Sequence, residues 1–292
     1  MLHFFASKEH QAKLSLVSAM LIFGTIGLFV RYIPMPSSCI AFARGFIGTL
    51  FIIGFLLIKK TPISWTAIRQ NIGRLILSGI FIGFNWIFLF EAYRYTSVAV
   101  ATLCYYMAPV IVIIASPMVL KERLTVYKLF CVIVALIGMV LVSGAGQETE
   151  MNNLTGVYFG LGAAVLYASI IILNKKFSSI AAYDKTIMQL GIASIVLLPY
   201  VWATEDISAM TLSPLGIGLL LFLGIIHTGF AYTLYFGSLP CLRGQTIALL
   251  SYLDPIFAVF LSAFVLHEPL SFFGILGAIL VLGSTCLSEL KK

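Results

Sequence analysis

Charged residues are scarce in this sequence of 292 residues. Only 10% of them are Asp, Glu, Lys or Arg, whereas 61% are hydrophobic, and the mean hydropathy is +1.06. Soluble domains carry about 25% charged residues. Because a soluble core cannot bury so much apolar side chain, the composition excludes a water-soluble globular protein. It predicts a membrane protein that exposes much of its surface to lipid.

Long polar segments are missing as well, so no water-soluble domain fits between the apolar runs. A helix crosses the hydrocarbon core with about 20 apolar residues. We therefore expect an all-α membrane protein with ten transmembrane helices. The polar N-terminus has no small-residue cleavage site, so the first helix is expected to be retained. The ten windows are 13–32, 38–58, 73–92, 97–119, 125–143, 155–175, 184–203, 213–237, 244–266 and 271–288.

The sequence also lacks the motifs of metal and nucleotide sites. Its five cysteines stand singly in apolar windows, without the spacing of a disulfide framework or a zinc site, and are interpreted as small core residues. No Gly-Lys dipeptide occurs, which excludes a phosphate-binding P-loop. We expect no bound metal and no cofactor.

The net charge of +7 reflects an uneven distribution of Lys and Arg. With the N-terminus in the cytoplasm, 15 of these residues fall on the inner side and only Arg31 and Arg94 on the outer side, while Arg44 lies within the second predicted helix. Such a bias sets the orientation of membrane proteins. We therefore predict a multi-pass protein of the cell (cytoplasmic) membrane with both termini cytoplasmic, rather than a basic surface for nucleic acid.

Two segments of the chain resemble each other at a distance of 146 residues. Residues 75–124 and 221–270 align without a gap and share 14 identities in 50 positions. Apolar composition explains chance matches of Leu and Ile, but not a matched tyrosine, proline and glutamate. We infer an internal duplication, whose most informative pairs are Tyr106/Tyr252, Pro109/Pro255 and Glu122/Glu268.

Each copy holds five predicted helices, within residues 1–145 and 154–292. Because five is an odd number, the second copy enters the membrane upside down. Inverted repeats are typical of secondary transporters, whose halves exchange conformations around a site near the membrane midplane. The sequence therefore predicts two inverted five-helix repeats and transport by alternating access.

The fourth predicted helix of each copy ends in a related motif, "APVIVIIASPMVLKERLT" (108–125) and "DPIFAVFLSAFVLHEPLS" (254–271). With the five-plus-five arrangement, these motifs resemble the EamA-type transporters of the drug/metabolite transporter superfamily over nearly the whole chain. The resemblance implies a membrane carrier without an ATPase of its own. It also implies a central cavity lined by the first-to-fourth and sixth-to-ninth helices. It does not specify a substrate, because the family exports amino acids, other metabolites and toxic compounds.

One carboxylate, Asp254, stands near the middle of the ninth predicted helix. An aspartate at the membrane centre costs about 2.5–3.5 kcal/mol on insertion scales and is expected to face a cavity or a partner. We interpret it as a coupling residue that carries protons. The alternative is a structural pair with Arg44, His227 or a hydroxyl group. Its repeat mate is Ala108, so the symmetric fold does not itself require the charge.

Pro109 and Pro255 are the predicted hinges. A proline within a helix lacks an N–H group and displaces the carbonyl group four residues before it, which for Pro255 is that of Ser251. We expect a kink here, with freed backbone groups that need partners.

Two further polar side chains lie within predicted helices. Arg44 either extends its head group to the membrane interface or binds a carboxylate in the cavity. His227 is assigned to coupling because a histidine titrates near neutral pH. A hydrogen-bonded interior histidine is the alternative.

Aromatic residues recur on the third and eighth predicted helices. Trp86 and Tyr232 are repeat mates and are expected to meet across the pseudo-symmetry axis, as are Tyr106 and Tyr252. Such rings would bind a planar or aliphatic substrate, or a cation; the alternative is packing or contact with lipid. Tyr252 and Asp254 are about 200° apart around a helix, so both face one cavity only if the turn is distorted. The predicted substrate-binding residues are Arg44, Asn85, Trp86, Tyr106, Tyr232 and Tyr252.

These features predict a secondary transporter, and not an enzyme, that exports a small organic metabolite, with an amino acid as the favoured substrate and protons as the candidate coupling ion. The alternative is export of cationic drugs or amines with Asp254 as counter-ion. An intramembrane enzyme would need clustered acids or a nucleophile with its base. A channel would need a filter-like loop, and the sequence suggests neither.

Overall fold

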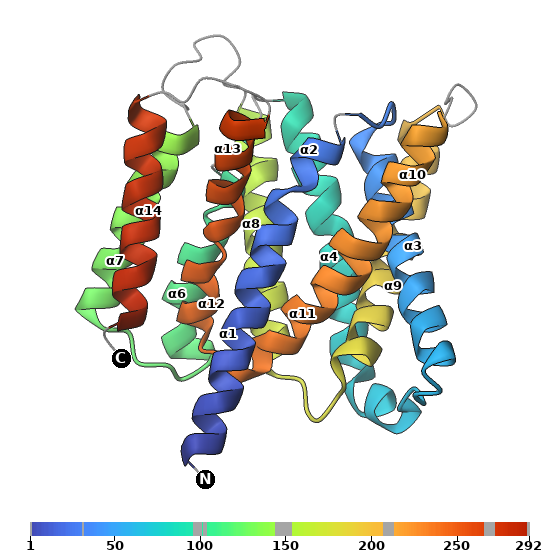
Figure 1. The fold of residues 1–292 in the computed structure, drawn as a ribbon, viewed down its shortest axis with the longest axis horizontal. Coiled ribbons are helices and arrows are strands. Elements are labelled where there is room, and N and C mark those ends of the chain that lie inside the picture. Colours follow the sequence, from blue (N-terminus) through green and yellow to red (C-terminus); the bar gives the residue numbers. More distant parts are fainter. Residues whose placement is uncertain are drawn as a thin grey trace.

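The computed structural model describes residues 2–30, 32–95, 101, 104–143, 154–206, 213–265 and 272–290. All regular secondary structure in these ranges is helical (Figure 1). Six helical segments are long and apolar enough to cross a membrane: Lys8–Val30, Ser37–Ile58, Trp65–Tyr95, Leu154–Lys175, Ala182–Thr204 and Pro214–Cys241. Shorter apolar helices cover Ala108–Val119, Val126–Leu141 and Phe272–Ser284.

The helices follow one another along the chain as in Figure 1. The first half contains α1 (Leu2–Gly24), α2 (Ile26–Val30), α3 (Ser37–Ile58), α4 (Trp65–Tyr95), α6 (Ala108–Val119) and α7 (Val126–Ser143). The second half begins with α8 (Leu154–Lys175), α9 (Ala182–Thr204), α10 (Pro214–Phe222), the π-helix η2 (Leu223–Phe230) and α11 (Ala231–Ser238). It ends with the 3₁₀-helix η3 (Leu239–Cys241), α12 (Gly244–Leu250), α13 (Leu253–Val265) and α14 (Phe272–Leu290).

Breaks interrupt several of these helices near the middle of the bundle. Thr25 separates α1 from α2, and a turn at Ser251 and Tyr252 separates α12 from α13, so the kink predicted before Pro255 is confirmed. Tyr106 forms an equivalent turn before α6. Pro109 and Pro255 then fall in the first turn of the following helix, where the missing N–H group has no partner to lose.

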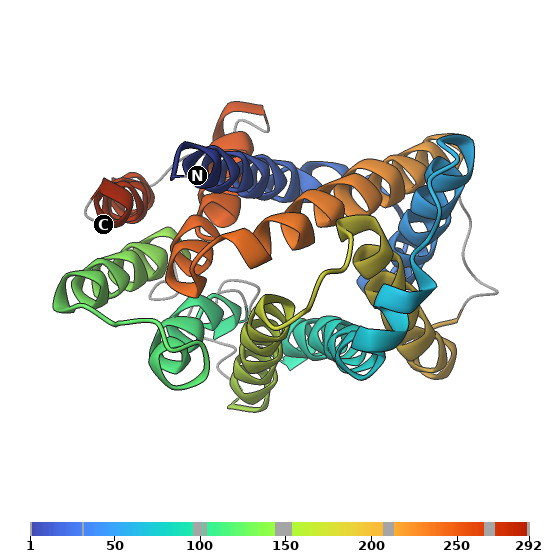
Figure 2. The same ribbon diagram turned by 90° about the horizontal axis from the view of Figure 1, so that it is seen from below.

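The helices pack into one bundle, with α7 and α14 as a pair at one side (Figure 2). In the main bundle α4 packs on α8 and α9, α3 on α9 and η2, and α1 on α11 and α13, while α6 contacts α8 and α12. Small residues allow close approach. A Cβ atom on Gly48 of α3 would lie 3.0 Å from the carbonyl oxygen of Gly224 in η2.

One basic residue at the start of a helix is buried. Lys185, counted among the inner-side charges, is only 1% exposed in the first turn of α9. Its Nζ donates to the carbonyl oxygen of Phe236 over 2.6 Å. This carbonyl belongs to the last turn of α11, whose final carbonyl groups lack partners within the helix. The ammonium group therefore fastens the end of one helix to the start of another.

Candidate functional site

A cavity of about 340 Å³ lies in the main bundle, bordered by α1, α2, α3, α4, α8, α11, α13 and the turn before α6. Most of its lining is aromatic or aliphatic, and its polar members include Arg44, Asn85 and Asp254. The lining reaches Val30 and Ser37, at the α2 end of the bundle (top of Figure 1). An apolar cavity of this size with a few convergent polar groups is typical of a small-molecule site.

Asp254 reaches the cavity from the first turn of α13. A carboxylate is favoured there because the unpaired N–H groups of a helix start carry partial positive charge. The hydroxyl group of Tyr106 donates to its Oδ2 over 3.3 Å. Gly24, at the end of α1, allows the close approach of the two helices, since a Cβ atom there would lie 2.7 Å from the carbonyl oxygen of Asp254.

Arg44 also faces the cavity, from α3. Its guanidinium carbon lies 4.8 Å from the centre of the Trp86 ring, a cation–π contact within the cavity lining. Within the described residues its buried Nε has no hydrogen-bond partner, and no ion pair joins Arg44 to Asp254. The pair of Asp254 with Arg44 is therefore absent from these residues, whereas the pair with a hydroxyl group is present, since Tyr106 donates to Asp254. The cavity holds one cationic and one acidic side chain that do not neutralise each other by contact.

The two predicted ring pairs are in contact. Trp86 and Tyr232 have ring centres 6.2 Å apart at an interplanar angle of 77°, and Tyr106 and Tyr252 have centres 6.4 Å apart at 45°. Trp86, Tyr106 and Tyr232 line the cavity. Contacts across the bundle, between segments far apart in sequence, are what the proposed pseudo-symmetry requires.

Tyr252 itself does not line the cavity, so the geometry argues against direct contact between this residue and a ligand. Its side chain is fully buried, and its hydroxyl group donates to the carbonyl oxygen of Tyr106 over 3.3 Å. The reason is the angular separation of Tyr252 and Asp254, which the turn at Ser251 and Tyr252 does not remove. Asp254 faces the cavity, whereas Tyr252 lies outside the lining and holds Tyr106 in place through this hydrogen bond.

Several aromatic lining residues were not predicted from the sequence. Tyr105 and Tyr167 stack with ring centres 5.3 Å apart at 8°, and the Tyr235 hydroxyl donates to that of Tyr167 over 3.3 Å. Phe23 packs against Tyr232, with ring centres 5.0 Å apart. For Tyr105 and Tyr167 the sequence offered only a tyrosine inside an apolar window, which does not indicate which face of a helix is inward.

Asn85 lines the cavity and also connects two helices. Its Nδ2 donates to the carbonyl oxygen of Ala163 in α8 over 2.7 Å. Part of the hydrogen-bonding capacity of this amide is therefore structural.

His227 lies in the π-helix η2, outside the cavity lining. Its ring lies between those of Phe29 and Phe222, and its Nε2 is 2.6 Å from Oγ1 of Thr25. Because that hydroxyl group donates to the carbonyl oxygen of Ile22 over 2.7 Å, the neutral imidazole donates from Nε2. The buried Nδ1 then has no partner among the described residues. The geometry is that of the hydrogen-bonded interior histidine.

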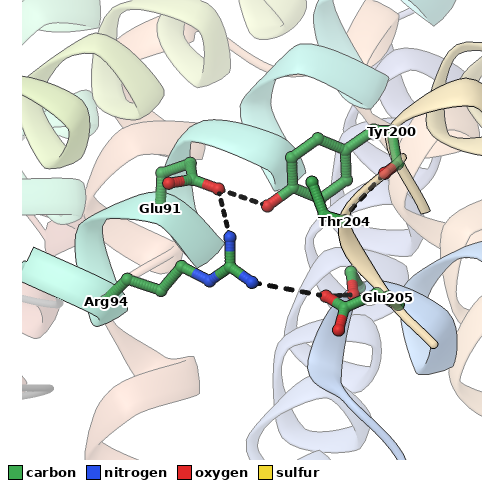
Figure 3. A network of polar contacts seen from close by, with 6 residues as sticks. Glu91, Arg94, Tyr200, Thr204 and Glu205 are labelled. Atoms are coloured by element: carbon green, nitrogen blue, oxygen red, sulfur yellow. Dashed lines mark hydrogen bonds and ion pairs between the residues drawn. The ribbon is translucent and has the colours of Figure 1, made fainter. Parts of the chain in front are cut away.

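A polar network connects α4, α9 and α3 at the α2 end of the bundle (Figure 3). Arg94 Nη1 lies 3.1 Å from Oε1 of Glu91, and Arg94 Nη2 lies 3.8 Å from Oε1 of Glu205. Glu91 also accepts from the Tyr200 hydroxyl, and Glu205 from that of Ser38 over 2.6 Å. None of these charged groups belongs to the cavity lining.

Glu122 connects the two halves of the chain at the opposite end. Its Oε1 lies 3.1 Å from Nζ of Lys175, at the end of α8, and accepts from the backbone N–H of Gly244 over 2.9 Å. Lys175 in turn donates to the carbonyl oxygen of Leu242. Glu268, the repeat mate of Glu122, lies outside the described residues.

Acidic, histidine and cysteine side chains are dispersed over the bundle. The described ranges contain no group of three or more His, Cys, Asp or Glu side chains able to hold a metal ion.

Comparisons with known proteins agree with this architecture. The model of the EamA-like transporter family matches residues 11–144 and 154–290. Similar proteins include the uncharacterized transporter YxxF of Bacillus subtilis (strain 168), 29% identical over 98% of this chain and 92% of that protein. An uncharacterized transporter of Archaeoglobus fulgidus is 26% identical over 94% of each chain. A protein crystal structure, 18% identical, shares the fold with a TM-score of 0.84 over 96% of this chain and 97% of the other.

Proposed function

Since this chain belongs to the EamA-like transporter family, we propose that it is a secondary carrier that exports an amino acid across the cytoplasmic membrane by alternating access. The observation that carries the proposal is the presence of Arg44 and Asp254 in one cavity without an ion pair between them. A zwitterionic amino acid offers a carboxylate to the guanidinium and an ammonium group to the carboxyl group. Its side chain would then lie against the rings of Trp86, Tyr106 and Tyr232.

Charge-assisted hydrogen bonds are the strong polar contacts of buried sites. An Arg side chain suits a carboxylate because its planar fork of donors matches the two oxygens. The buried Nε of Arg44, without a partner in the described residues, is a donor of this kind beside the cavity. A hydrophobic amino acid would combine this contact with the aromatic lining.

Export of cationic drugs or amines is the second candidate. The aromatic lining favours it, because rings attract organic cations, and Asp254 would be the counter-ion. Arg44 in the same cavity disfavours it, because two like charges in a poorly solvated space repel strongly. The geometry therefore favours a ligand that carries both charges.

A proton and the substrate ammonium group would compete for the carboxyl group of Asp254. A carrier whose single carboxyl group binds one or the other exchanges protons for substrate, and an inward proton gradient then drives the substrate outward. His227, hydrogen-bonded to Thr25 away from the cavity lining, would instead stabilise the break between α1 and α2.

The helix packing supports two inverted repeats, residues 1–145 and 154–292, with ten transmembrane helices. When each helix is replaced by its equivalent in the other half, the helix contacts are reproduced. The contact of α4 with α9 corresponds to that of η2 with α3, and the contact of α4 with α8 corresponds to that of α11 with α1. The contact of α6 with α8 becomes that of α13 with α1, while α7 and α14 exchange places within their own pair. The two separate matches of the family model have the same division.

The two ends of the bundle support alternating access. The cavity lining reaches the α2 end, whereas Glu122, Lys175 and Gly244 connect the halves at the other end. The N and C marks of Figure 1 lie at that second end, which the basic residues assign to the cytoplasm. This arrangement corresponds to a state with its cavity directed outward.

Counterflow in proteoliposomes tests the substrate and requires no imposed gradient of the driving ion. Uptake of labelled phenylalanine is measured with unlabelled compounds as competitors. Phenylalanine itself is compared with phenethylamine, which lacks the carboxylate, and with 3-phenylpropanoate, which lacks the ammonium group. We expect uptake that phenylalanine inhibits at least about tenfold better than either analogue, since each loses one charge-assisted contact worth about 1.5–3 kcal/mol.

Arg44→Gln should reduce this selectivity against phenethylamine, with the exposed Arg69→Gln as its matched control. Equal inhibition by phenethylamine and phenylalanine would favour the amine exporter instead. Uptake no higher than in empty liposomes would exclude aromatic amino acids while leaving the carrier class in place.

A further inference from the structure

A second cavity lies at the end of the bundle that holds Glu122, between the α6–α7 link and the start of α12. Its volume is about 720 Å³. Four basic residues contribute to its lining: Lys121, Arg123 and Lys128 from the α6–α7 region, and Arg243 from the residue before α12. Two segments more than a hundred residues apart in sequence therefore direct cationic side chains into one space.

The acidic residue of this lining already has partners of its own. Glu122 forms its ion pair with Lys175 and accepts from the backbone N–H of Gly244. Its charge therefore balances that of Lys175, which is not among the residues that line this cavity. Lys121, Arg123 and Arg243 therefore leave an excess of positive charge in the cavity.

Hydrogen bonds hold the backbone around these side chains. Gln245 is 1% exposed, and its Nε2 donates to the carbonyl oxygen of Arg123 over 3.3 Å. The Thr125 hydroxyl accepts from the backbone N–H of Lys128 over 3.3 Å at the start of α7. Cationic groups on a fixed frame lose little entropy when they bind an anion.

Apolar side chains are exposed directly beside the cavity. Met118 and Val126, which flank the α6–α7 link, are each 85% exposed, and Phe130 is 60% exposed one turn further along α7. In a membrane-embedded bundle such side chains face acyl chains. Cationic groups next to them lie at the level of the lipid head groups.

We propose that this cavity binds the phosphate group of an anionic phospholipid, with its acyl chains along α6 and α7. Basic pockets between helices on the cytoplasmic side suit such head groups, and Arg side chains bind phosphate oxygens through two donors at once. Because Glu122 links the two halves beside this site, bound lipid would stabilise the closed arrangement of this end. This site is separate from the substrate cavity, so lipid binding there does not depend on the identity of the substrate.

An excess of basic residues on the cytoplasmic side can also serve orientation alone. A matched pair of variants distinguishes the two explanations. Arg123→Gln with Arg243→Gln removes two charges from the cavity. Arg69→Gln with Arg74→Gln removes two exposed charges from the first half of α4, outside the cavity lining, on the same expected side.

Thermal melting of the purified full-length protein in detergent, after removal of native lipid, measures the binding. We expect added phosphatidylglycerol to raise the melting temperature and phosphatidylcholine to leave it unchanged. The half-saturating phosphatidylglycerol concentration should rise about 25-fold in the cavity variant, about fivefold for each cation removed, and stay within about twofold in the α4 variant. Native mass spectrometry should show a retained phosphatidylglycerol molecule that the cavity variant loses.

Equal weakening in both double variants, or unchanged affinity in the cavity variant, would overturn the site. Inorganic phosphate is tested separately at matched concentration. If it alone raises the melting temperature, and the cavity variant abolishes the effect, the phosphate chemistry stands but its source is a soluble anion and the lipid assignment is wrong.

Discussion

The hydroxyl group of Tyr106 donates a hydrogen bond to Oδ2 of Asp254 over 3.3 Å, across 148 positions of sequence. Tyr106 forms the turn before α6, and Asp254 lies in the first turn of α13, directly after the turn at Ser251 and Tyr252. The bond therefore joins two helix breaks on the wall of the cavity. Any movement of one break relative to the other changes the surroundings of the carboxyl group.

Replacement of the carboxyl group by an amide tests its role in coupling. In Asp254→Asn the amide oxygen still accepts from Tyr106, so the fold is expected to remain, but the side chain no longer releases a proton. We expect the affinity for labelled amino acid in counterflow to fall about tenfold, because a hydrogen bond to a charged group is lost. A pH gradient should no longer drive uptake in proteoliposomes, and full, pH-responsive transport by this variant would contradict proton carriage by Asp254.

The close approach of α1 to α13 at Asp254 depends on Gly24. In Gly24→Ala the new Cβ atom would lie 2.7 Å from the carbonyl oxygen of Asp254 and 3.1 Å from Cβ of Phe257. Overpacking of this kind costs about 1–3 kcal/mol, and it should appear as a lower melting temperature. The control is Gly54→Ala in α3, where a Cβ atom meets nothing within 4 Å. It should be neutral or stabilising by up to about 1 kcal/mol, and equal losses in both variants would contradict the packing argument.

Glu122 is expected to stabilise the end of the bundle opposite α2. Glu122→Gln removes the negative charge from a contact with Lys175 in which both side chains are only 13% exposed. We expect a loss of about 1–3 kcal/mol in the free energy of unfolding, because partly buried charged partners are left behind. Glu9→Gln breaks the more exposed pair of Glu9 with Lys13 and should cost less than about 1 kcal/mol. Melting curves of the two variants make the comparison, and similar shifts would argue against a special role for Glu122.

The repeat in the sequence predicted contacts that no local pattern contains. The pairs of Trp86 with Tyr232 and of Tyr106 with Tyr252 follow from aligning the two halves at one offset. Asp254 was recognisable because placing a carboxylate inside an apolar window costs free energy, so such a residue is expected to face a cavity or a partner. The break before Pro255 followed from the missing N–H group of proline.

Other features depend on helix rotation and on tertiary packing. Hydrophobic periodicity is weak in helices that are apolar all round. The sequence therefore did not show whether Tyr167 lies on the inward face of α8. The π-helix η2 adds a residue to a helical turn, and no pattern in the sequence predicted it. It places His227 against Thr25, outside the cavity lining. Lys185 was counted among the inner-side charges, and its burial depends on a tertiary contact, the hydrogen bond to the Phe236 carbonyl oxygen.

A final variant separates the two residues that were assigned to coupling. His227→Gln keeps a side-chain N–H group for Thr25 but removes the titratable imidazole. Since His227 does not line the cavity, we expect transport that still responds to pH, with a melting temperature lowered by the loss of ring contacts with Phe29 and Phe222. Thr25→Val provides the matched test of the hydrogen bond. It leaves the donor Nε2 buried without an acceptor, at a cost of about 1–3 kcal/mol, and should also preserve the pH response. If His227→Gln abolishes the response to a pH gradient while Thr25→Val retains it, the histidine itself carries the proton and the structural role proposed for it is wrong.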